Sequence, residues 1–385
     1  MLWIKIVFWI VALLIFYIYF GYPFLLGLIS LLRKKQLKIN NAYEPTASLI
    51  IAAFNEEISI KKKIENSLKL DYPVDKLEII IFSDASTDKT DDIVRGFADM
   101  GVKLLRIEGR KGKTFCQNEA VNMATGDVLV FSDANSMYQL DAIKKLVRHF
   151  VDPNVGCVSG ELQYQSGPES VKGESSYWRY EQLLKRLETR ISSVVSANGA
   201  IYAVGRNCYV PLPADVISDF VEPLELIRNG YRVVYEPESI ATETTAADSE
   251  REFQRRVRIV TRSVQSLLRY MSLLSLLNPL QNGVFSLQLL SHKVLRWLSG
   301  VFLLLTFALN IFLVGQGPIY TITISCQLLF YLLASWGYIS EVRLKQKAPK
   351  IPHISYYFCL SCYAMLKGIS HALSGKIIVT WKTNR

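Results

Sequence analysis

The sequence has few cysteines, and they do not form the paired motifs of a metal or disulfide site. Six cysteines occur in 385 residues, and only Cys359 and Cys362 form a CxxC pair. That pair lies in an aromatic-rich apolar segment without a second pair, so the pattern argues against a zinc or redox site. The other four are Cys116, Cys157, Cys208 and Cys326. We expect reduced thiols in a cytosolic compartment.

The sequence also lacks a nucleic-acid-binding module, an internal repeat and a low-complexity linker. The net charge is +10, but many basic residues flank apolar segments. A membrane surface and an anionic substrate therefore explain the charge better than nucleic acid does. Half of the residues are apolar, and they concentrate at the N-terminus and in the last quarter. This distribution predicts a globular region between membrane-associated ends.

Residues 1–38 predict a transmembrane helix followed by a basic flank. Leu2 to Leu32 is apolar apart from Lys5, and about 20 such residues can span a bilayer. A cleaved signal peptide would have a shorter apolar core. Gly21 and Pro23 indicate a kink or two helical pieces. Arg33, Lys34, Lys35 and Lys38 place this end in the cytoplasm by the positive-inside rule.

Residues 45–264 alternate between strand and helix patterns, which predicts a doubly wound α/β domain in the cytosol. The expected strands are 48–54, 78–82, 102–107, 128–131, 155–164, 200–204 and 231–235. The expected helices are 58–70, 88–100, one ending near 124, 175–195, 219–229 and 249–270.

The C-terminal quarter has three expected parts. Residues 265–292 contain apolar pieces, 267–277 and 284–290, that are too short to span and read as interfacial helices. Residues 293–340 predict a transmembrane hairpin from 297–314 and 319–339. Residues 341–385 begin with a basic loop, which places the return of the hairpin in the cytoplasm. Segment 354–373 is interrupted by Lys367 and His371, so it could span, re-enter or lie flat.

Two expected strands end in residues that can bind a ligand. The stretch Gly126 to Ser136, GDVLVFSDANS, ends its apolar run at Asp133 and Asn135. Ligands bind beyond the carboxyl ends of strands in open α/β sheets, and these oxygen donors suit Mg²⁺ or Mn²⁺. Asp84 ends the second strand and could accept hydrogen bonds from a ribose or a base. The alternative is that both aspartates only stabilise turns.

Three charged groups have both a functional and an ordinary interpretation. Arg110, Lys111 and Lys113 could bind phosphate beside a helix N-terminus, or form a solvated basic loop. Their motif, GRKGKT, is not a Walker A sequence. Asp219 could be a general base, or Asp219 and Glu222 could only favour a helix start. Arg255, Arg256 and Arg258 could stabilise a leaving diphosphate or bind lipid headgroups.

Seven motifs occur in order along the chain: AAFNEE (52–57), FSDASTDKT (82–90), RKGKTFCQNEA (110–120), FSDANS (131–136), SDFVEPLEL (218–226), GYRVVYEPE (230–238) and FQRRVR (253–258). Together they resemble the membrane-bound glycosyltransferases of family 2, the group related to cellulose, chitin and hyaluronan synthases. The resemblance covers essentially the whole chain. It implies a GT-A fold and an inverting transfer from a nucleotide-sugar.

The resemblance also implies a role for each matched residue. Asp84 would hold the nucleoside with Ala53 and Glu56 nearby, and Lys113 would lie near the nucleotide. Asp133 matches the first aspartate of the DxD motif, and with Asn135 it would bind Mg²⁺ or Mn²⁺. The remaining matches are Asp219, as the catalytic base, and Arg256 and Arg258, as the arginine-bearing positions of the QxxRW region.

Four positions depart from the family pattern. Asn135 replaces the second acid of DxD, so one negative charge is missing at the expected metal. Ser218 replaces the acid that usually precedes the base. Arg255 and Ile259 stand where processive synthases have the glutamine and tryptophan of QxxRW, which puts processive polymerisation in doubt.

We therefore expect a multi-pass enzyme of the cell (inner) membrane that uses a nucleotide-sugar, with UDP as the expected nucleotide. The acceptor would be a polysaccharide, an oligosaccharide or a lipid, and a homo-oligomer or an export partner could take part. One alternative is a single-sugar transferase acting on polyisoprenyl phosphate. Another is an inactive membrane scaffold that retained the nucleotide-binding fold.

Overall fold

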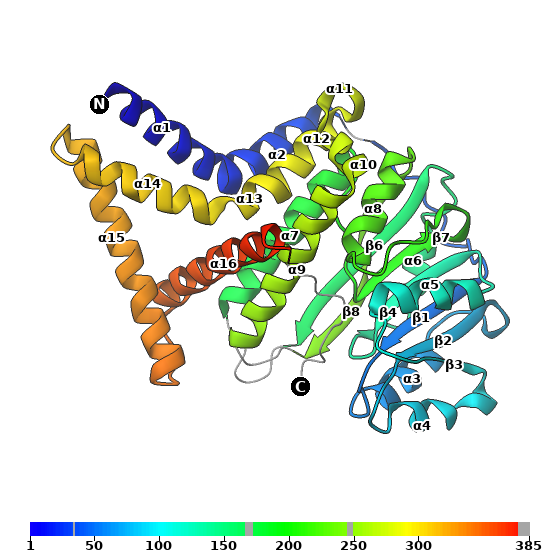
Figure 1. The fold of residues 1–385 in the computed structure, drawn as a ribbon. Helices are drawn as coiled ribbons and strands as arrows, with labels where there is room; N and C mark the ends of the chain where they lie inside the picture. The colour runs from blue at the N-terminus through cyan, green and yellow to red at the C-terminus, as the bar shows by residue number, and fades with distance from the viewer. Residues whose placement is uncertain (34, 166–171, 245–248, 376–385) are drawn as a thin grey trace.

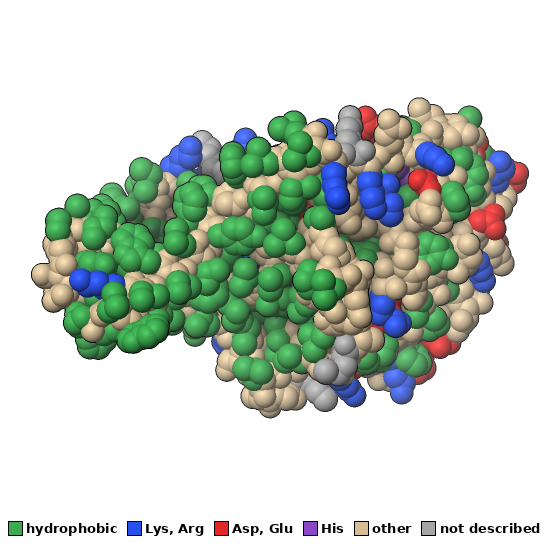
Figure 2. All heavy atoms as spheres, turned by 90° about the horizontal axis from the view of Figure 1, so that it is seen from above, with side chains coloured by type: hydrophobic (Ala, Val, Ile, Leu, Met, Phe, Trp, Pro, Cys, Tyr) green, Lys and Arg blue, Asp and Glu red, His purple; other side chains and the backbone are tan. Residues whose placement is uncertain are grey.

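The computed structural model describes residues 1–33, 35–165, 172–244 and 249–375. One part of the molecule is a sheet with helices on its faces, and the other is an assembly of long helices (Figure 1). Apolar side chains gather over the end formed by the long helices, whereas charged side chains mark the other end (Figure 2). The fold therefore combines an α/β region with a region of apolar helices.

The sheet has eight strands in the spatial order β3-β2-β1-β4-β7-β6-β8-β5. Their bounds are β1 Ala47–Ala53, β2 Leu77–Asp84, β3 Val102–Ile107, β4 Val128–Asp133, β5 Met137–Tyr138, β6 Val155–Gln165, β7 Ile201–Gly205 and β8 Arg232–Thr244. The first four in the spatial order are parallel, and β7 is antiparallel to both β4 and β6. The parallel register brings the carboxyl ends of β1, β2 and β4 to one edge, where Ala52 pairs with Asp133 and Ala53 with Ser83.

Helices cover both faces of the sheet, so every residue of β1 is buried. Leu49 and Ile51 pack toward α3 (Ile60–Leu68), α4 (Thr90–Arg95) and α6 (Ala142–Val147). Ile50 and Ala52 pack toward α5 (Lys113–Met123) and α8 (Ser218–Arg228). Burial on both faces explains why these strands appear in the sequence as continuous apolar runs.

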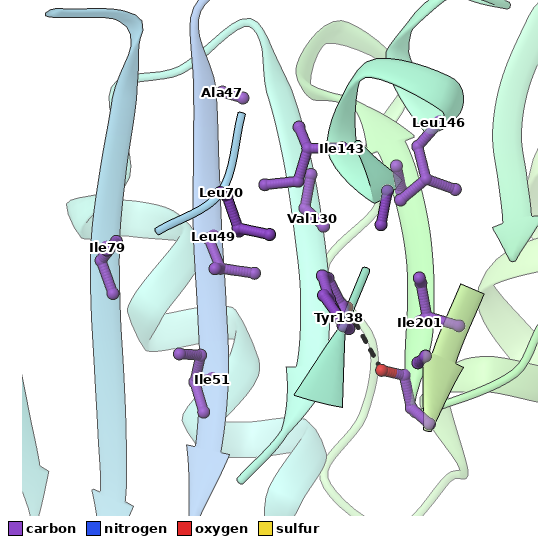
Figure 3. Close-up of a cluster of buried hydrophobic side chains, with 14 of the residues drawn as sticks. Ala47, Leu49, Ile51, Leu70, Ile79, Val130, Tyr138, Ile143, Leu146 and Ile201 are labelled. Carbon is purple, nitrogen blue, oxygen red and sulfur yellow. Dashed lines mark hydrogen bonds between the residues drawn. The ribbon is translucent and has the colours of Figure 1, made fainter. Parts of the chain in front are cut away.

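Figure 3 shows the first of these two clusters, with side chains of β1, β2, β4 and α6 gathered together. Tyr138 lies in this cluster, and its hydroxyl is 3.0 Å from the carbonyl oxygen of Phe131 and 3.2 Å from that of Ala200. This tyrosine therefore ties the segment after Asp133 to the core of the sheet.

Two strands differ from the sequence prediction. The short strand β5 was not expected, and β8 continues to Thr244 rather than ending at Tyr235. The expected strand ended just before the polar stretch Glu236–Glu238, which contains Pro237. In the structure, Arg148 binds both glutamates, at 2.6 Å and 2.7 Å, and His149 lies 2.7 Å from Glu236. These partners let a polar stretch continue the strand.

Among the residues that the structure describes, two helical segments are long and apolar enough to cross a membrane, by length and composition: Leu2–Leu32 and Pro318–Arg343. The first consists of α1 (Leu2–Phe16), a π-helical turn at Tyr17–Gly21 and α2 (Tyr22–Leu32). The second contains α15 (Pro318–Tyr338). Helix α16 (Lys350–Leu373) is not among the candidate spans of the described residues, and it packs along α9 (Ser249–Arg269) and α15.

The region before the expected hairpin is more continuous than predicted. Val284–Trp297 and Ser299–Leu313 form a helical pair bent by 59°, which could serve as a third span. It comprises α12 (Val284–Leu289), the π-helical segment η6 (Leu290–Val294), α13 (Leu295–Trp297) and α14 (Ser299–Leu313). The sequence prediction separated the pieces 284–290 and 297–314. In the structure the helix continues through η6, where His292 binds Glu181 and Glu188 on α7 (Lys172–Ile191).

Gly126, just before β4, tests how closely the backbones of β4 and β1 pack at the start of β4. A Cβ atom at this position would lie 2.6 Å from backbone atoms of Ala47 and Ser48. We predict that Gly126→Ala destabilises the domain by about 2 kcal/mol or more, because the backbone of a central strand cannot move aside.

Thermal unfolding of the purified full-length chain in detergent would measure this change. Gly27→Ala is the control, since a Cβ at Gly27 meets nothing within 4 Å. Equal melting temperatures for the two variants would contradict the proposed close contact.

Candidate active site

Asp84, the last residue of β2, is fully buried and holds the basic loop in place. Its carboxylate accepts hydrogen bonds from the backbone N–H groups of Lys111 at 2.7 Å and Gly112 at 3.1 Å. Gly112 has a backbone φ of 94°, which residues with a Cβ atom rarely adopt. These contacts fix the start of α5 and make Lys113 its first residue.

Lys113, Asp133 and Asp219 come together although they are far apart in the chain. The ammonium group of Lys113 forms an ion pair with Asp133 at the end of β4. The carboxylate of Asp219 accepts a hydrogen bond from the backbone N–H of Gly199 at 3.1 Å. A Cβ on Gly199 would be 2.8 Å from Asp219 Oδ2 and 3.5 Å from Lys113 Nζ, so this glycine lies between the two groups.

The surroundings of Asp219 favour a carboxylate that can accept a proton. Burial raises the pKa of Asp219, and the charge of Lys113 opposes this effect, while the nearby charge of Asp133 adds to it. Glu222, one turn later in α8, is fully buried and accepts a hydrogen bond from the Val210 backbone at 3.3 Å. Burial raises the pKa of Glu222 to about 8.

The loop after β1 packs against the loop after β2 at the same edge of the sheet. Ala53 is fully buried and pairs with Ser83, directly before Asp84. The backbone N–H of Glu56 donates to Thr90 Oγ1 at 2.7 Å, and its carboxylate accepts a hydrogen bond from Ser59. Asn135 is half-buried in the turn after β4.

The arginines of α9 divide between two sides of the helix. Arg256 binds Glu252 at 2.8 Å and the hydroxyl of Tyr357, on α16, at 2.6 Å. Arg258 interacts with the charge of Asp133, and Arg262 with that of Asp219. The charges of Asp133 and Asp219 thus act on Arg258 and Arg262, whereas the hydrogen bonds of Arg256 link α9 to α16.

Two charged residues beneath Asp133 were not anticipated. Lys63 on α3 is fully buried, donates to the backbone oxygen of Ser136 and lies 3.8 Å from the ring centre of Tyr138. Burial lowers the pKa of Lys63 to about 7, although the charges of Asp133 and Glu243 oppose this shift. Glu243, near the end of β8, accepts a hydrogen bond from Ser136, and burial and the charge of Asp133 raise its pKa.

Comparison with known proteins now identifies the domain. Residues 48–205 match the model of glycosyl transferase family 2. Poly-β-1,6-N-acetyl-D-glucosamine synthase of Staphylococcus aureus is 26% identical over 199 residues, which cover 49% of this chain and 48% of the relative. The probable glycosyltransferase YdaM of Bacillus subtilis is 33% identical over 125 residues, 31% of this chain and 30% of the relative. The chain thus spans at most about half the length of these curated relatives.

A mannosyltransferase from Pyrobaculum calidifontis, solved with GDP-mannose and Mn²⁺, shares the fold over almost its whole length. The TM-score is 0.73, with 20% sequence identity, 95% of this chain and 99% of that chain covered. Residues 48–205 form a family 2 glycosyltransferase domain. The predicted family and the α/β fold of GT-A type are confirmed.

The donor atoms at the carboxyl edge of this domain fit a metal ion that is shared with a substrate. Asp133 supplies a carboxylate, one oxygen of which meets Lys113, and Asn135 supplies an amide oxygen. Within residues 1–33, 35–165, 172–244 and 249–375, no group of three His, Cys, Asp or Glu side chains is placed to hold a metal. Mg²⁺ or Mn²⁺ bound here would therefore take further ligands from the diphosphate. Metal binding by Asp133 and Asn135 stays a prediction.

Gly199 tests the alignment of this glycosyltransferase site. We predict that Gly199→Ala lowers the turnover rate about a hundredfold, because the added methyl group displaces Asp219 from Lys113 and small misplacements are costly in catalysis. The rate of sugar transfer and the affinity for the free nucleotide are measured for the variant and for the wild type. The melting temperature of the variant is the control for folding. Unchanged turnover in a folded variant would show that the spacing of these side chains is unimportant.

Proposed function

We propose that this glycosyltransferase moves a sugar from a nucleotide-diphospho-sugar to a saccharide or lipid acceptor at the cytosolic face of the cell (inner) membrane. The observation that carries this proposal is the convergence of Asp219 with Lys113 and Asp133 at the carboxyl edge of the sheet. A UDP-sugar is the first donor to test. GDP-mannose is the second, because the mannosyltransferase with the same fold contains it.

The proposed reaction is a single displacement at the anomeric carbon. Asp219 takes the proton of the acceptor hydroxyl, whose oxygen forms a bond to this carbon as the bond to the diphosphate oxygen breaks. The electron pair of the breaking bond leaves with the diphosphate, and the configuration at the carbon inverts. Lys113 and Arg258 stabilise the negative charge on the leaving group. A divalent metal bound by Asp133 and Asn135 would add positive charge beside the phosphates.

We propose that Asp84, Ala53 and Glu56 line the part of the site that binds the nucleoside. Arg256 is proposed to affect diphosphate binding through its link to α16. Asp84 already orients the loop that carries Lys113, so its contribution includes positioning. Arg256 is bound to Glu252 and Tyr357, so its contribution to diphosphate binding is proposed to be indirect.

The proposed membrane orientation follows from the candidate spans. Arg33 and Lys35 come directly after Leu2–Leu32, and basic residues also follow Pro318–Arg343. The positive-inside rule then places the catalytic domain on the cytosolic side. Basic residues after both of these spans can lie in the cytosol only if the bent pair is a third span, so we propose three spans and a multi-pass enzyme.

One observation favours the second candidate, transfer of a single sugar to polyisoprenyl phosphate. Ile259 is 39% exposed on α9, at the position where processive synthases have the tryptophan of QxxRW. An exposed isoleucine offers no aromatic face for a growing saccharide to stack on. The Staphylococcus aureus relative, a named polymer synthase, supports the first candidate instead.

We predict that Asp219→Asn reduces sugar transfer to background and leaves nucleotide affinity within about twofold of wild type. The amide cannot accept the acceptor proton, whereas the nucleotide is bound by other residues. Radiolabelled donors incubated with membranes, with the products sorted into lipid, polymer and free sugar, measure transfer. Turnover at the wild-type rate would refute the role of Asp219 and with it the proposed mechanism.

The raised pKa of Asp219 also predicts the pH dependence of wild-type transfer. The carboxylate becomes protonated and inactive as pH falls through this pKa. The acidic decline of kcat/KM should therefore have its midpoint above pH 3.9, which is about the usual aspartate pKa. A profile of kcat/KM against pH measures this acidic limb. A rate that stays constant down to pH 4 would contradict the assignment.

We predict that Asp133→Ala abolishes the dependence of donor binding on Mn²⁺ and weakens binding at least about tenfold. The substitution removes the one carboxylate of the expected metal pair, and charged contacts are typically worth this much or more. Calorimetry of nucleotide binding with and without Mn²⁺ gives the comparison. An unchanged Mn²⁺ effect in the folded variant would place the metal elsewhere or exclude it.

A further inference from the structure

The backbone carbonyl of Val216, in the segment before α8, accepts hydrogen bonds from two other helices. The hydroxyl of Thr114 on α5 donates to this oxygen at 2.7 Å, and the guanidinium of Arg262 on α9 donates to the same oxygen. Thr114 and Val216 are each 1% exposed, and Arg262 is 5% exposed. A carbonyl oxygen has two lone pairs, so these two buried donors use both of them.

Each helix that donates to this carbonyl also carries a charged residue of the proposed site. Lys113 directly precedes Thr114 at the start of α5. Arg258 lies one turn before Arg262 on α9, and residues four apart lie on the same face of a helix. Lys113 and Arg258 are the two residues proposed to stabilise the leaving diphosphate. The carbonyl therefore joins the two helices that would hold the donor.

The same carbonyl is close in sequence to the proposed base. Val216 is three residues before Asp219, and α8 begins between them at Ser218. The N-cap position is Ile217, whose aliphatic side chain cannot accept the hydrogen bond that Ser, Thr, Asp or Asn accepts there. Helix α8 lies beside α9 in the fold (Figure 1). The start of α8 is thus placed by the contacts of the preceding residues rather than by a cap of its own.

Other hydrogen bonds attach Asp219 to the sheet. The backbone N–H of Ala197 donates to the backbone oxygen of Asp219 at 2.9 Å, and that of Gly199 donates to its carboxylate at 3.1 Å. Ala197 and Gly199 precede β7, so these bonds place Asp219 against the sheet. The bonds at Val216 instead tie its segment to α5 and α9. Together the two sets locate the carboxylate relative to the charges on these helices.

We propose that Thr114 and Arg262 are positioning residues that act through the carbonyl of Val216. They hold the proposed base, Asp219, at its working distance from the diphosphate ligands on α5 and α9. The start of α5 is fixed separately by Asp84, so loss of a bond at Val216 should shift α8 rather than α5. Catalysis should therefore suffer more than nucleotide binding. This inference rests on the proposed function, because it takes Asp219 as the base.

Three substitutions at position 114 test the role of the hydroxyl. Thr114→Val keeps the shape of the side chain but removes the donor, Thr114→Ala removes the donor and the methyl group, and Thr114→Ser keeps the donor. We expect kcat to fall at least about tenfold with Val or Ala, since small misplacements of reacting groups are costly, and to stay within about twofold of wild type with Ser. The assay is sugar transfer by the full-length chain in detergent, from the radiolabelled UDP-sugar or GDP-mannose that the wild type uses.

Two outcomes of this series would overturn the proposal. One is a wild-type kcat in Thr114→Val, or in Thr114→Ala if the valine variant does not fold. The other is a kcat in Thr114→Ser as low as that in Thr114→Ala, because that result would assign the effect to packing of the methyl group rather than to the hydrogen bond.

Thr261→Val is the matched control. Thr261 on α9 is fully buried, and its hydroxyl donates to the backbone oxygens of Val257 at 2.8 Å and of Gly368, on α16, at 3.2 Å. Thr261→Val should lower the melting temperature about as much as Thr114→Val does, yet keep kcat. Affinities for UDP and GDP should stay within about twofold of wild type in both. Equal losses of kcat, or a tenfold loss of nucleotide affinity in Thr114→Val, would overturn the positioning role.

Arg262→Met combined with Thr114→Val tests whether the two donors act through one carbonyl. If the segment shifts once either donor is lost, kcat of the double variant should be close to that of the slower single variant. Independent sites would instead multiply their losses. A multiplied loss, or a wild-type kcat in Arg262→Met, would overturn the shared role of the two residues.

Asp219→Asn in the same assay separates this inference from the proposed function. If Asp219→Asn is inactive while Thr114→Val has a wild-type kcat, the inference fails and the proposed function stands. If the wild type transfers no sugar from either donor, or Asp219→Asn transfers it at the wild-type rate, the proposed function fails, and this inference fails with it.

Discussion

The buried carboxylate of Asp84 fixes the loop on which the rest of the site depends. By accepting the N–H groups of Lys111 and Gly112, it sets where α5 begins and where Lys113 points. Lys113 then meets Asp133, and Gly199, whose backbone N–H binds the carboxylate of Asp219, lies next to both Asp219 and this lysine. Three segments of the sheet domain therefore meet because one strand end is bound to a loop through backbone hydrogen bonds.

The balance of charge around this meeting point favours an anionic ligand. Arg258 is half-buried without an ion pair among the described residues, although the charge of Asp133 acts on it, and Arg262 binds only the backbone oxygen of Val216 there. Buried cations without counter-ions are unfavourable unless an anion joins them. The diphosphate of the proposed donor would supply such an anion. Asp219, the proposed catalytic base, carries a charge that acts on Arg262.

The sheet and the family could be predicted because their signals are local. Strands buried on both faces produce apolar runs, and the acidic residues after them fall at one edge by topology alone. Which arginines of α9 face the site could not be read from the motif alone, because it depends on the helical periodicity of 3.6 residues per turn. Positions 255, 258 and 262 share a helical face, whereas Arg256 lies about 100° away from Arg255 and reaches Tyr357.

The residues that were missed depend on contacts between distant segments. Lys63 belongs to the run Lys61–Lys63, which resembles a solvated helix face, and nothing local distinguishes the one lysine that is buried beneath Ser136. Glu243 lies beyond Tyr235, where its strand was expected to end. The helix was expected to break between 290 and 297, whereas His292 in η6 binds Glu181 and Glu188, which are about a hundred residues away. Such pairings are set by tertiary packing and leave no periodic pattern in the sequence.

A structure of the full-length chain with a non-hydrolysable nucleotide-sugar would test the central claim most directly. The account predicts that the diphosphate lies within hydrogen-bond distance of Lys113 and that the anomeric carbon faces the carboxylate of Asp219. A nucleotide bound away from Lys113, or a sugar whose anomeric carbon is turned away from Asp219, would contradict it.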